Sequence, residues 1–243
     1  MVIVSKEVIK EFLIKDNKYW IVFTGDSLTS CEWVHPNWRE IVIYVLQNEI
    51  TNFLNGDWKL TEWGIKGFNF AYDGATTTDI LKKVDDIICV NPQLIISLMG
   101  GNDPSLGIGV EESIDNIKEI SKKVNSKGIK LVWCSSTPAM FDSFKNSQYK
   151  PYSNAFLKTQ IDGVNKIDMF NKYQKFPLDK IFTFTSEENP VENIKEGEPD
   201  LIHPNQLGNA YIAKVILKDL FKIEFDPEKY IRETLEGKKY PGY

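Results

Sequence analysis

The sequence is poor in the residue types that build metal centres and disulfide frameworks. It has three cysteines, Cys31, Cys89 and Cys134, and two histidines, His35 and His203. The cysteines are odd in number, and their spacings do not match those of zinc sites. We therefore expect no disulfide scaffold and no structural metal, and we predict a reducing, cytoplasmic setting.

The chain also lacks an excess of basic residues and a long apolar run. Its 29 Lys and Arg residues are outnumbered by 34 Asp and Glu residues, which gives a formal net charge of -5 over 243 residues. Nucleic acids and anionic membranes attract clustered Lys and Arg, so neither is an expected partner. No run reaches the roughly 18 apolar residues that a membrane span requires. Lys6 and Glu7 interrupt the apolar stretch that a signal peptide needs, so secretion by that route is not expected.

What the sequence does contain is an alternation of apolar strands and amphipathic helices. Such alternation predicts right-handed crossovers and a mostly parallel sheet with helices on both faces, here as one α/β domain over residues 1–243. We interpret 52–66 as a loop. Strands are predicted at 19–23, 67–71, 93–99 and 129–135, and helices at 5–15, 36–48, 77–90 and 110–127.

The alternation is less regular between residues 139 and 199. A helix around 154–162 and a strand or edge element at 164–169 continue the pattern, whereas 170–199 has no steady periodicity. A long irregular connection is uncommon in a compact domain and is typical of a functional loop. We therefore predict a lid or pocket wall at about 139–199.

Ser27 is the candidate nucleophile. It follows Gly25 and Asp26 at the end of an apolar strand, and a helical pattern begins shortly afterwards. Open α/β sheets bind ligands at this end of their strands, and a helix N-terminus there favours negative charge. Gly-Asp-Ser is also a common turn sequence, so the tripeptide alone allows a purely structural interpretation. Cys31 is an alternative nucleophile, but it has no assigned base and is more typical of a small buried residue.

The groups that a serine nucleophile needs occur later in the chain. Asp200 stands three residues before His203, so its carboxylate can hold the imidazole while the other ring nitrogen faces Ser27. The alternative is that this pair only caps the following helix. The Ser27 backbone N–H, Gly74 and the Asn102 side chain are the candidate oxyanion donors.

Four further residues are predicted at or near the substrate pocket. Asp26 and Asp103 are interpreted chiefly as hydrogen-bond acceptors that organise their loops. Trp33 offers an aromatic face for a sugar or an acyl chain. His35 is expected either at the pocket entrance or in a capping or surface position.

Four ordered motifs resemble the sequence blocks of the SGNH (GDSL) hydrolases over about residues 19–220. The resemblance implies a flavodoxin-like three-layer α/β/α sandwich and no metal or organic cofactor. It also implies that the family's Ser, Gly, Asn and His fall on Ser27, Gly74, Asn102 and His203, and its Asp on Asp200. Gly74 and residues 139–199 match least. The motifs are Gly25-Asp26-Ser27-Leu28, Gly74, Gly100-Gly101-Asn102-Asp103 and Asp200-Leu201-Ile202-His203.

The predicted function is a serine esterase that hydrolyses a small carboxylic ester through an acyl-enzyme, with an O-acetyl group on a carbohydrate as the favoured substrate. The small-molecule ester is the expected partner. Lysophospholipid or thioester cleavage is one alternative, and a catalytically silent carbohydrate-binding domain on the same fold is another. A dinuclear metallophosphoesterase needs more histidine ligands than the two in this chain.

Overall fold

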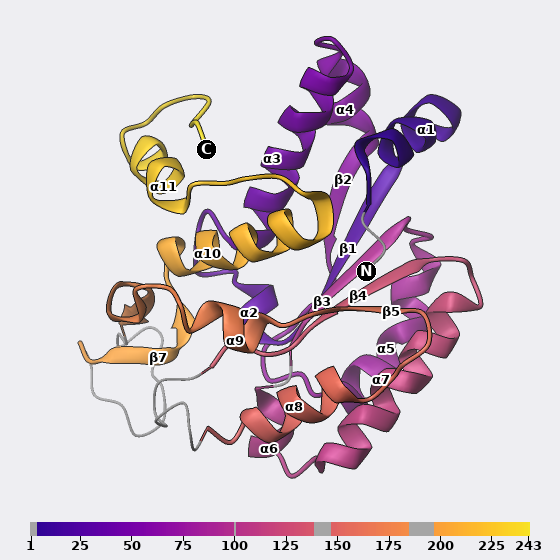
Figure 1. The fold of residues 1–243 in the computed structure, drawn as a ribbon, viewed down its shortest axis with the longest axis vertical. Helices are drawn as coiled ribbons and strands as arrows, with labels where there is room; N and C mark the ends of the chain where they lie inside the picture. Colours follow the sequence, from indigo (N-terminus) through magenta and orange to yellow (C-terminus); the bar gives the residue numbers. More distant parts are fainter. Residues whose placement is uncertain (1–3, 100, 139–146, 185–196) are drawn as a thin grey trace.

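The computed structural model describes residues 4–99, 101–138, 147–184 and 197–243 (Figure 1). At its centre lies a five-stranded sheet in the order β2-β1-β3-β4-β5, and every neighbouring pair is parallel. This is the flavodoxin-like strand order. β2 is added on one side of β1, whereas β3, β4 and β5 are added on the other, so the switch point lies between β1 and β3. The strands are β1 (Tyr19–Gly25), β2 (Ile65–Asn69), β3 (Leu94–Leu98), β4 (Lys130–Cys134) and β5 (Val164–Ile167).

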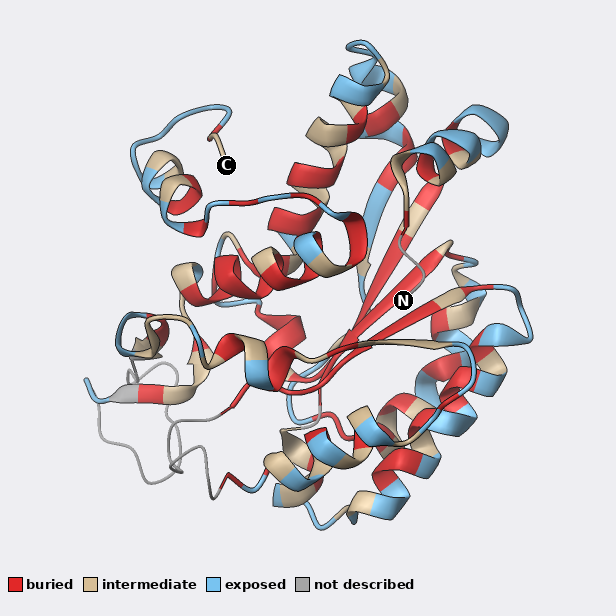
Figure 2. Cartoon of the chain, viewed as in Figure 1, coloured by how far each residue is buried: buried red, intermediate tan, exposed pale blue. Residues whose placement is uncertain are grey.

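The sheet is covered by helices on both faces. α1 (Lys6–Asp16), α3 (Trp38–Phe53) and α10 (Gln206–Ile216) belong to one apolar cluster, which takes Ile21 and Phe23 from β1. α5 (Thr77–Cys89), α7 (Val110–Asn125) and α8 (Lys150–Lys158) belong to the other, which takes Val22. Neighbouring residues of a strand point to opposite faces, so β1 supplies both clusters. Figure 2 shows the result as buried central strands between half-buried helices. The predicted three-layer sandwich is confirmed.

Shorter elements complete the described chain. β6 (Phe182–Phe184) and β7 (Pro199–Pro204) pair antiparallel in a separate two-stranded sheet. No helix among the described residues combines the length and apolar character needed to cross a membrane. The other elements are α2 (Ser27–Ser30), α4 (Trp58–Gly64), α6 (Asn102–Ser105), α9 (Met169–Tyr173), a 3₁₀ turn at Leu178–Lys180, a π turn at Leu217–Phe221 and α11 (Pro227–Leu235).

One local prediction was wrong. The presumed loop at 52–66 contains α4 and the beginning of β2. The Asp57 side chain caps α4 by accepting a hydrogen bond of 3.2 Å from the Leu60 backbone N–H. Trp58 and Trp63 stay exposed, at 49% and 63%, so this helix shows no clear apolar face in the sequence.

The segment predicted as a lid or pocket wall is described only in part. Residues 139–146 and 185–196 lie outside the described residues. The described part contains α8, β5, α9 and β6, with α8 beginning at Lys150 and ending at Lys158 rather than running over 154–162.

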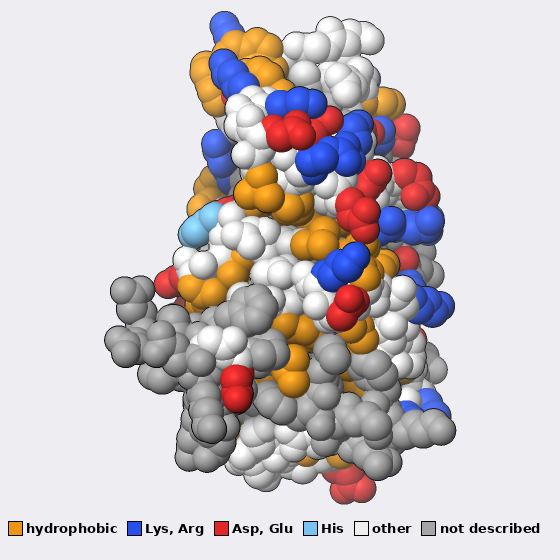
Figure 3. Space-filling model, turned by 90° about the vertical axis from the view of Figure 1, so that its left-hand side faces the viewer, with side chains coloured by type: hydrophobic (Ala, Val, Ile, Leu, Met, Phe, Trp, Pro, Cys, Tyr) orange, Lys and Arg blue, Asp and Glu red, His pale blue; other side chains and the backbone are white. Residues whose placement is uncertain are grey.

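The surface carries charges of both signs. On the face in Figure 3, Lys and Arg side chains lie among Asp and Glu side chains, with hydrophobic side chains between them. Charges of one sign therefore do not form a separate patch on the described part of this face.

Candidate active site

Ser27 lies on a tight turn between β1 and α2, next to the carboxyl end of β3. A Cβ at Gly25, whose φ is +150°, would come within 2.0 Å of the Leu98 carbonyl oxygen, so only glycine fits there. The Thr29 hydroxyl donates to the same carbonyl at 2.7 Å. Asp26 caps α2 by accepting from the Leu28 N–H at 3.0 Å. The turn is thereby fixed against the neighbouring strand.

The other end of α2 is held by the start of α3. Trp38 is fully buried and its indole N–H donates to the Leu28 carbonyl at 2.9 Å. The Arg39 guanidinium donates to the Thr29 and Ser30 carbonyls, each at 2.5 Å. These bonds satisfy carbonyls that a four-residue helix cannot pair internally.

Asp200, His203 and Ser27 form a hydrogen-bonded line. His203 Nδ1 lies 2.5 Å from Asp200 Oδ2, and His203 Nε2 lies 2.8 Å from Ser27 Oγ. The other Asp200 oxygen accepts from the backbone N–H groups of Ile202, at 2.9 Å, and His203, at 3.2 Å. The structure therefore brings together the predicted alcohol, imidazole and carboxylate.

The Asp200 carboxylate is charged in its environment, although it is only 1% exposed. Burial raises its pKa, but the hydrogen bond and charge of His203, with the two backbone N–H groups, outweigh burial and bring the pKa below its ordinary value. An ionised carboxylate accepts the proton of Nδ1, which leaves the Nε2 lone pair facing the Ser27 hydroxyl.

A cavity of about 100 Å³, here called the Ser27 hollow, opens beside this line. Half-buried Asn102 lies in its wall at the start of α6. The Asn102 amide donates one hydrogen to the Ala75 carbonyl at 3.1 Å and retains a second donor. The hollow is lined by Asp26, Ser27, Leu28, Gly101, Asn102, Ser105, Ser136, Thr137, Tyr149, Ile202 and His203.

Gly74 lies next to this site but does not line the hollow in the described part of the chain. It occupies an exposed turn with φ +73°, a conformation that favours glycine. The turn is tied to α2 by a hydrogen bond from the Ser30 hydroxyl to Asp73, and to Asn102 through Ala75. Gly74 is thus connected to the site through its neighbours Asp73 and Ala75, and it does not itself contact the hollow in the described structure.

The two predicted aromatic pocket residues differ in position. The Trp33 ring meets the His203 ring edge to face, with 5.3 Å between centroids, and is 37% exposed. His35 instead lies on the surface, where its Nδ1 is 3.2 Å from Glu40 and its Nε2 is 3.0 Å from the Glu32 carbonyl. The expectation that His35 lines the pocket entrance is wrong, because both ring nitrogens are engaged away from the hollow.

Asp103 and Cys31 are structural. Asp103 is fully buried and accepts from the backbone and the hydroxyl of Thr77, both at 2.8 Å, so it joins α6 to α5 instead of lining the pocket. Burial raises the pKa of the Cys31 thiol to about 12. Its Sγ contacts the Leu28 carbonyl at 2.8 Å, which makes it a packing residue.

Sequence reasoning missed several lining residues. Ser136 and Thr137 directly follow β4, and the rule that parallel strands present ligands at their carboxyl ends would have found them. Tyr149 comes from the irregular segment and had no such signal. No group of three or more His, Cys, Asp or Glu side chains within the described ranges is arranged to hold a metal ion.

Comparisons with known proteins identify the fold and the family. No curated protein matches the sequence. The fold is similar to that of Axe2, an acetylxylan esterase from Geobacillus stearothermophilus, with a TM-score of 0.59 and 15% identity over 86% of this chain and 95% of that one. It is also similar to a lipase/acylhydrolase from Enterococcus faecalis, with a TM-score of 0.57 and 19% identity over 83% of this chain and 94% of that one.

The protein TesA is a further structural relative, with a TM-score of 0.56 and 14% identity over 81% of this chain and 95% of that one. At these identities the likeness establishes the fold. The family itself follows from a sequence model that matches residues 21–216, most of the chain. The chain belongs to the GDSL-like lipase/acylhydrolase family.

Proposed function

We propose that this protein is a serine esterase that works through an acyl-enzyme intermediate. The observation that carries the proposal is the line from Asp200 to His203 to Ser27, with distances of 2.5 and 2.8 Å. The 2.8 Å between His203 Nε2 and Ser27 Oγ is within the range for a nucleophile and its general base. Two solved structures of Axe2 are catalytic mutants in which a serine or a histidine of that esterase is replaced by alanine.

Acylation begins when His203 Nε2 takes the Ser27 proton while Ser27 Oγ bonds to the ester carbonyl carbon. The carbonyl electron pair moves to its oxygen, where the Ser27 backbone N–H and the Asn102 amide donate hydrogen bonds. The carbon–alkoxy bond then breaks, and the alcohol leaves with the proton from His203. Asp200 stabilises the imidazolium without accepting its proton.

Deacylation repeats these steps with water. His203 takes a proton from the water, whose oxygen bonds to the acyl carbon. Collapse of the tetrahedral intermediate breaks the bond to Ser27 Oγ, which recovers its proton from His203. The products are a carboxylic acid and the free enzyme.

A small acyl group on a carbohydrate is the substrate that these features support. The Ser27 hollow, at about 100 Å³, is small beside the 300 to 1,000 Å³ that is typical of ligand pockets. Trp33, with its exposed face beside His203, is suited to stack on a sugar alcohol. One structural relative, Axe2, is an acetylxylan esterase.

The test is covalent labelling. A fluorophosphonate probe is expected to label the wild-type protein on Ser27, and Ser27→Ala should lose both labelling and hydrolysis of p-nitrophenyl acetate. Acetylated xylo-oligosaccharides should release acetate. Hydrolysis that is equal in wild type and Ser27→Ala would remove the mechanism, and a wild-type protein without labelling or turnover would favour a silent carbohydrate-binding domain.

A further inference from the structure

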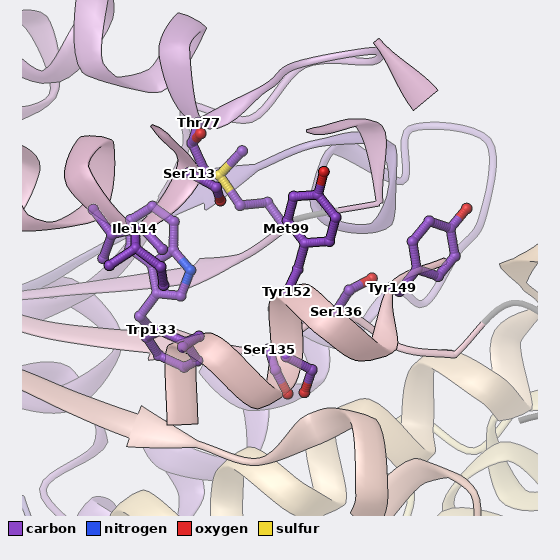
Figure 4. A pocket seen from close by; sticks show the side chains of 12 residues that line it. Thr77, Met99, Ser113, Ile114, Trp133, Ser135, Ser136, Tyr149 and Tyr152 are labelled. Carbon is purple, nitrogen blue, oxygen red and sulfur yellow. The ribbon is translucent and has the colours of Figure 1, made fainter. Parts of the chain in front are cut away.

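A second cavity of about 20 Å³, here called the inner cavity, lies beside the Ser27 hollow (Figure 4). That volume fits about one water molecule. Ser136 and Tyr149 line both cavities, so these two side chains separate them. The apolar part of its lining comes from the core between the sheet and α7 and α8, and consists of Met99, Ile114, Ile117, Trp133 and Phe156.

The Tyr149 ring is the larger of the two separating groups. It is only 5% exposed and packs against Phe170 and Ile202. Its Cζ lies 3.9 Å from the position that a Cβ on Gly101 would occupy, so the phenol end meets the turn that carries Asn102. Ser136 is smaller and its hydroxyl is held by the Thr137 carbonyl at 3.0 Å. The ring therefore closes the hollow on the side of the proposed oxyanion donor.

Most polar groups of the inner cavity already have protein partners. The Thr77 hydroxyl bonds to Asp103, the Ser135 hydroxyl accepts from the Phe170 N–H, and the Tyr152 hydroxyl donates to the Ile108 carbonyl. Ser153 differs, because its buried hydroxyl has no hydrogen-bond partner in the described structure. The inner cavity thus offers mainly apolar surface, which suits the terminal methyl or methylene group of an acyl chain.

The chemistry places the acyl group on the side of Tyr149. His203 must protonate the leaving alcohol, so the alcohol lies on the His203 side, where Trp33 is found. The acyl chain then enters the part of the hollow that Asn102, Gly101 and Tyr149 line. Its length is limited by the first side chain that it meets there.

We infer that Tyr149 is the specificity-determining residue that restricts the acyl group to short chains, with the inner cavity beyond its ring as an extension of the acyl site. This inference rests on the proposed esterase function. It assigns part of the predicted pocket wall to the N-terminal end of α8, since Tyr149 immediately precedes that helix.

The test is a chain-length profile of kcat/KM on p-nitrophenyl acetate, butyrate, hexanoate and octanoate. Wild type should prefer acetate and butyrate. Tyr149→Ala joins the two cavities and should raise the hexanoate-to-acetate ratio by about tenfold or more, since one or two buried methylenes account for such factors. Tyr149→Phe keeps the ring and is the matched control, with an unchanged profile.

Tyr149→Leu provides a second variant if the alanine variant unfolds, and it should shift the profile in the same direction by a smaller factor. In Tyr149→Ala/Ile117→Phe, a larger side chain refills the inner cavity and should reverse the gain. A wild type that hydrolyses octanoate as well as acetate, or folded variants with the wild-type profile, would overturn the role of Tyr149 and leave the esterase proposal intact. A wild type without Ser27 labelling would instead overturn the proposed function itself.

Discussion

Ser27 and His203 meet at one hydrogen bond, but they are held by different kinds of structure. Ser27 stands at the end of the central strand β1 and is braced by distant residues, with bonds to Leu98, Trp38 and Arg39 around its short helix. His203 stands on β7, in a two-stranded sheet outside the central one. It is oriented by Asp200, three residues away, through bonds to its ring and its backbone.

This contrast separates two ways of positioning a polar side chain at the candidate site. The serine turn depends on tertiary packing, because its partners come from other strands and helices. The segment Asp200–His203 of β7, here called the histidine arm, makes its main hydrogen bonds within itself. The paired strand β6 adds one more, from the Thr183 hydroxyl to the His203 carbonyl at 3.1 Å. We therefore expect changes at the histidine arm to affect chemistry more than stability, and changes around the serine turn to affect both.

The sharpest test of the histidine arm is His203→Ala. Loss of the general base should lower kcat by about 10⁴- to 10⁶-fold with little change in melting temperature. His35→Ala is the matched control, because this second histidine is exposed and bonded away from the hollow. Steady-state kinetics on p-nitrophenyl acetate measure both. Equal losses for the two variants would contradict the assignment.

Asp200→Asn should have the next largest effect. The amide cannot hold His203 in the tautomer that accepts the serine proton, so kcat should fall by about 10⁴-fold while residual turnover remains. Asp226→Asn is a suitable control, because Asp226 caps α11 and asparagine caps helices equally well. A wild-type rate in Asp200→Asn would show that the carboxylate is only structural.

Asn102→Ala tests the hollow between the two regions, because Ser27, His203 and Asn102 all line it. Removal of one oxyanion donor should lower kcat by about 10²- to 10³-fold with a small change in KM. Asn102→Asp keeps the shape but adds a negative charge, so its loss should be larger. A smaller loss in the aspartate variant would remove Asn102 from the oxyanion hole.

Arg39→Ala tests the bracing of the serine turn. Its two bonds to the C-terminal end of α2 predict a loss of about 2 kcal/mol in the free energy of unfolding. A loosened turn misplaces the nucleophile, so kcat should fall by about tenfold with KM unchanged. Lysine keeps the positive charge but lacks the two parallel donors of the guanidinium. Arg39→Lys should therefore lose less unfolding free energy and less kcat than Arg39→Ala. Denaturant unfolding and steady-state kinetics on the same preparations measure both effects. A kcat for Arg39→Ala equal to that of wild type would reject a positioning role for Arg39.

The pH dependence of stability gives the smallest expected effect. The Asp200 pKa in the folded protein lies below its ordinary value, so the unfolded chain binds more protons as the pH falls through about 4. The carboxylate therefore contributes stability that is present above about pH 5 and is lost in acid. The difference in unfolding free energy between wild type and Asp200→Asn should shrink as the pH is lowered from about 6 to about 3. A constant difference would mean that His203 does not stabilise the charge.

Sequence reasoning succeeded where the pattern is local or strongly periodic. The buried strands β1 and β3, the amphipathic helices α5 and α7 and the four motifs of the GDSL family were all apparent from spacing and residue type. It failed at α4, whose exposed tryptophans mask the helical pattern. It left His35 open between the pocket entrance and the surface, and contacts with Glu32 and Glu40 hold it on the surface. The position of Tyr149 could not be predicted, because it depends on the two cavities that its ring lines.

The sequence by itself determined the Gly25 turn and the pairing of Asp200 with His203, because both depend on bonds between residues close along the chain. Only the tertiary structure decided that Ser27 and His203, 176 positions apart, share a hydrogen bond, and that the Tyr149 ring separates two cavities. The physical reason is that local geometry is fixed by backbone dihedrals and spacing. Contacts between distant residues depend instead on strand order and on how the helices pack over the sheet.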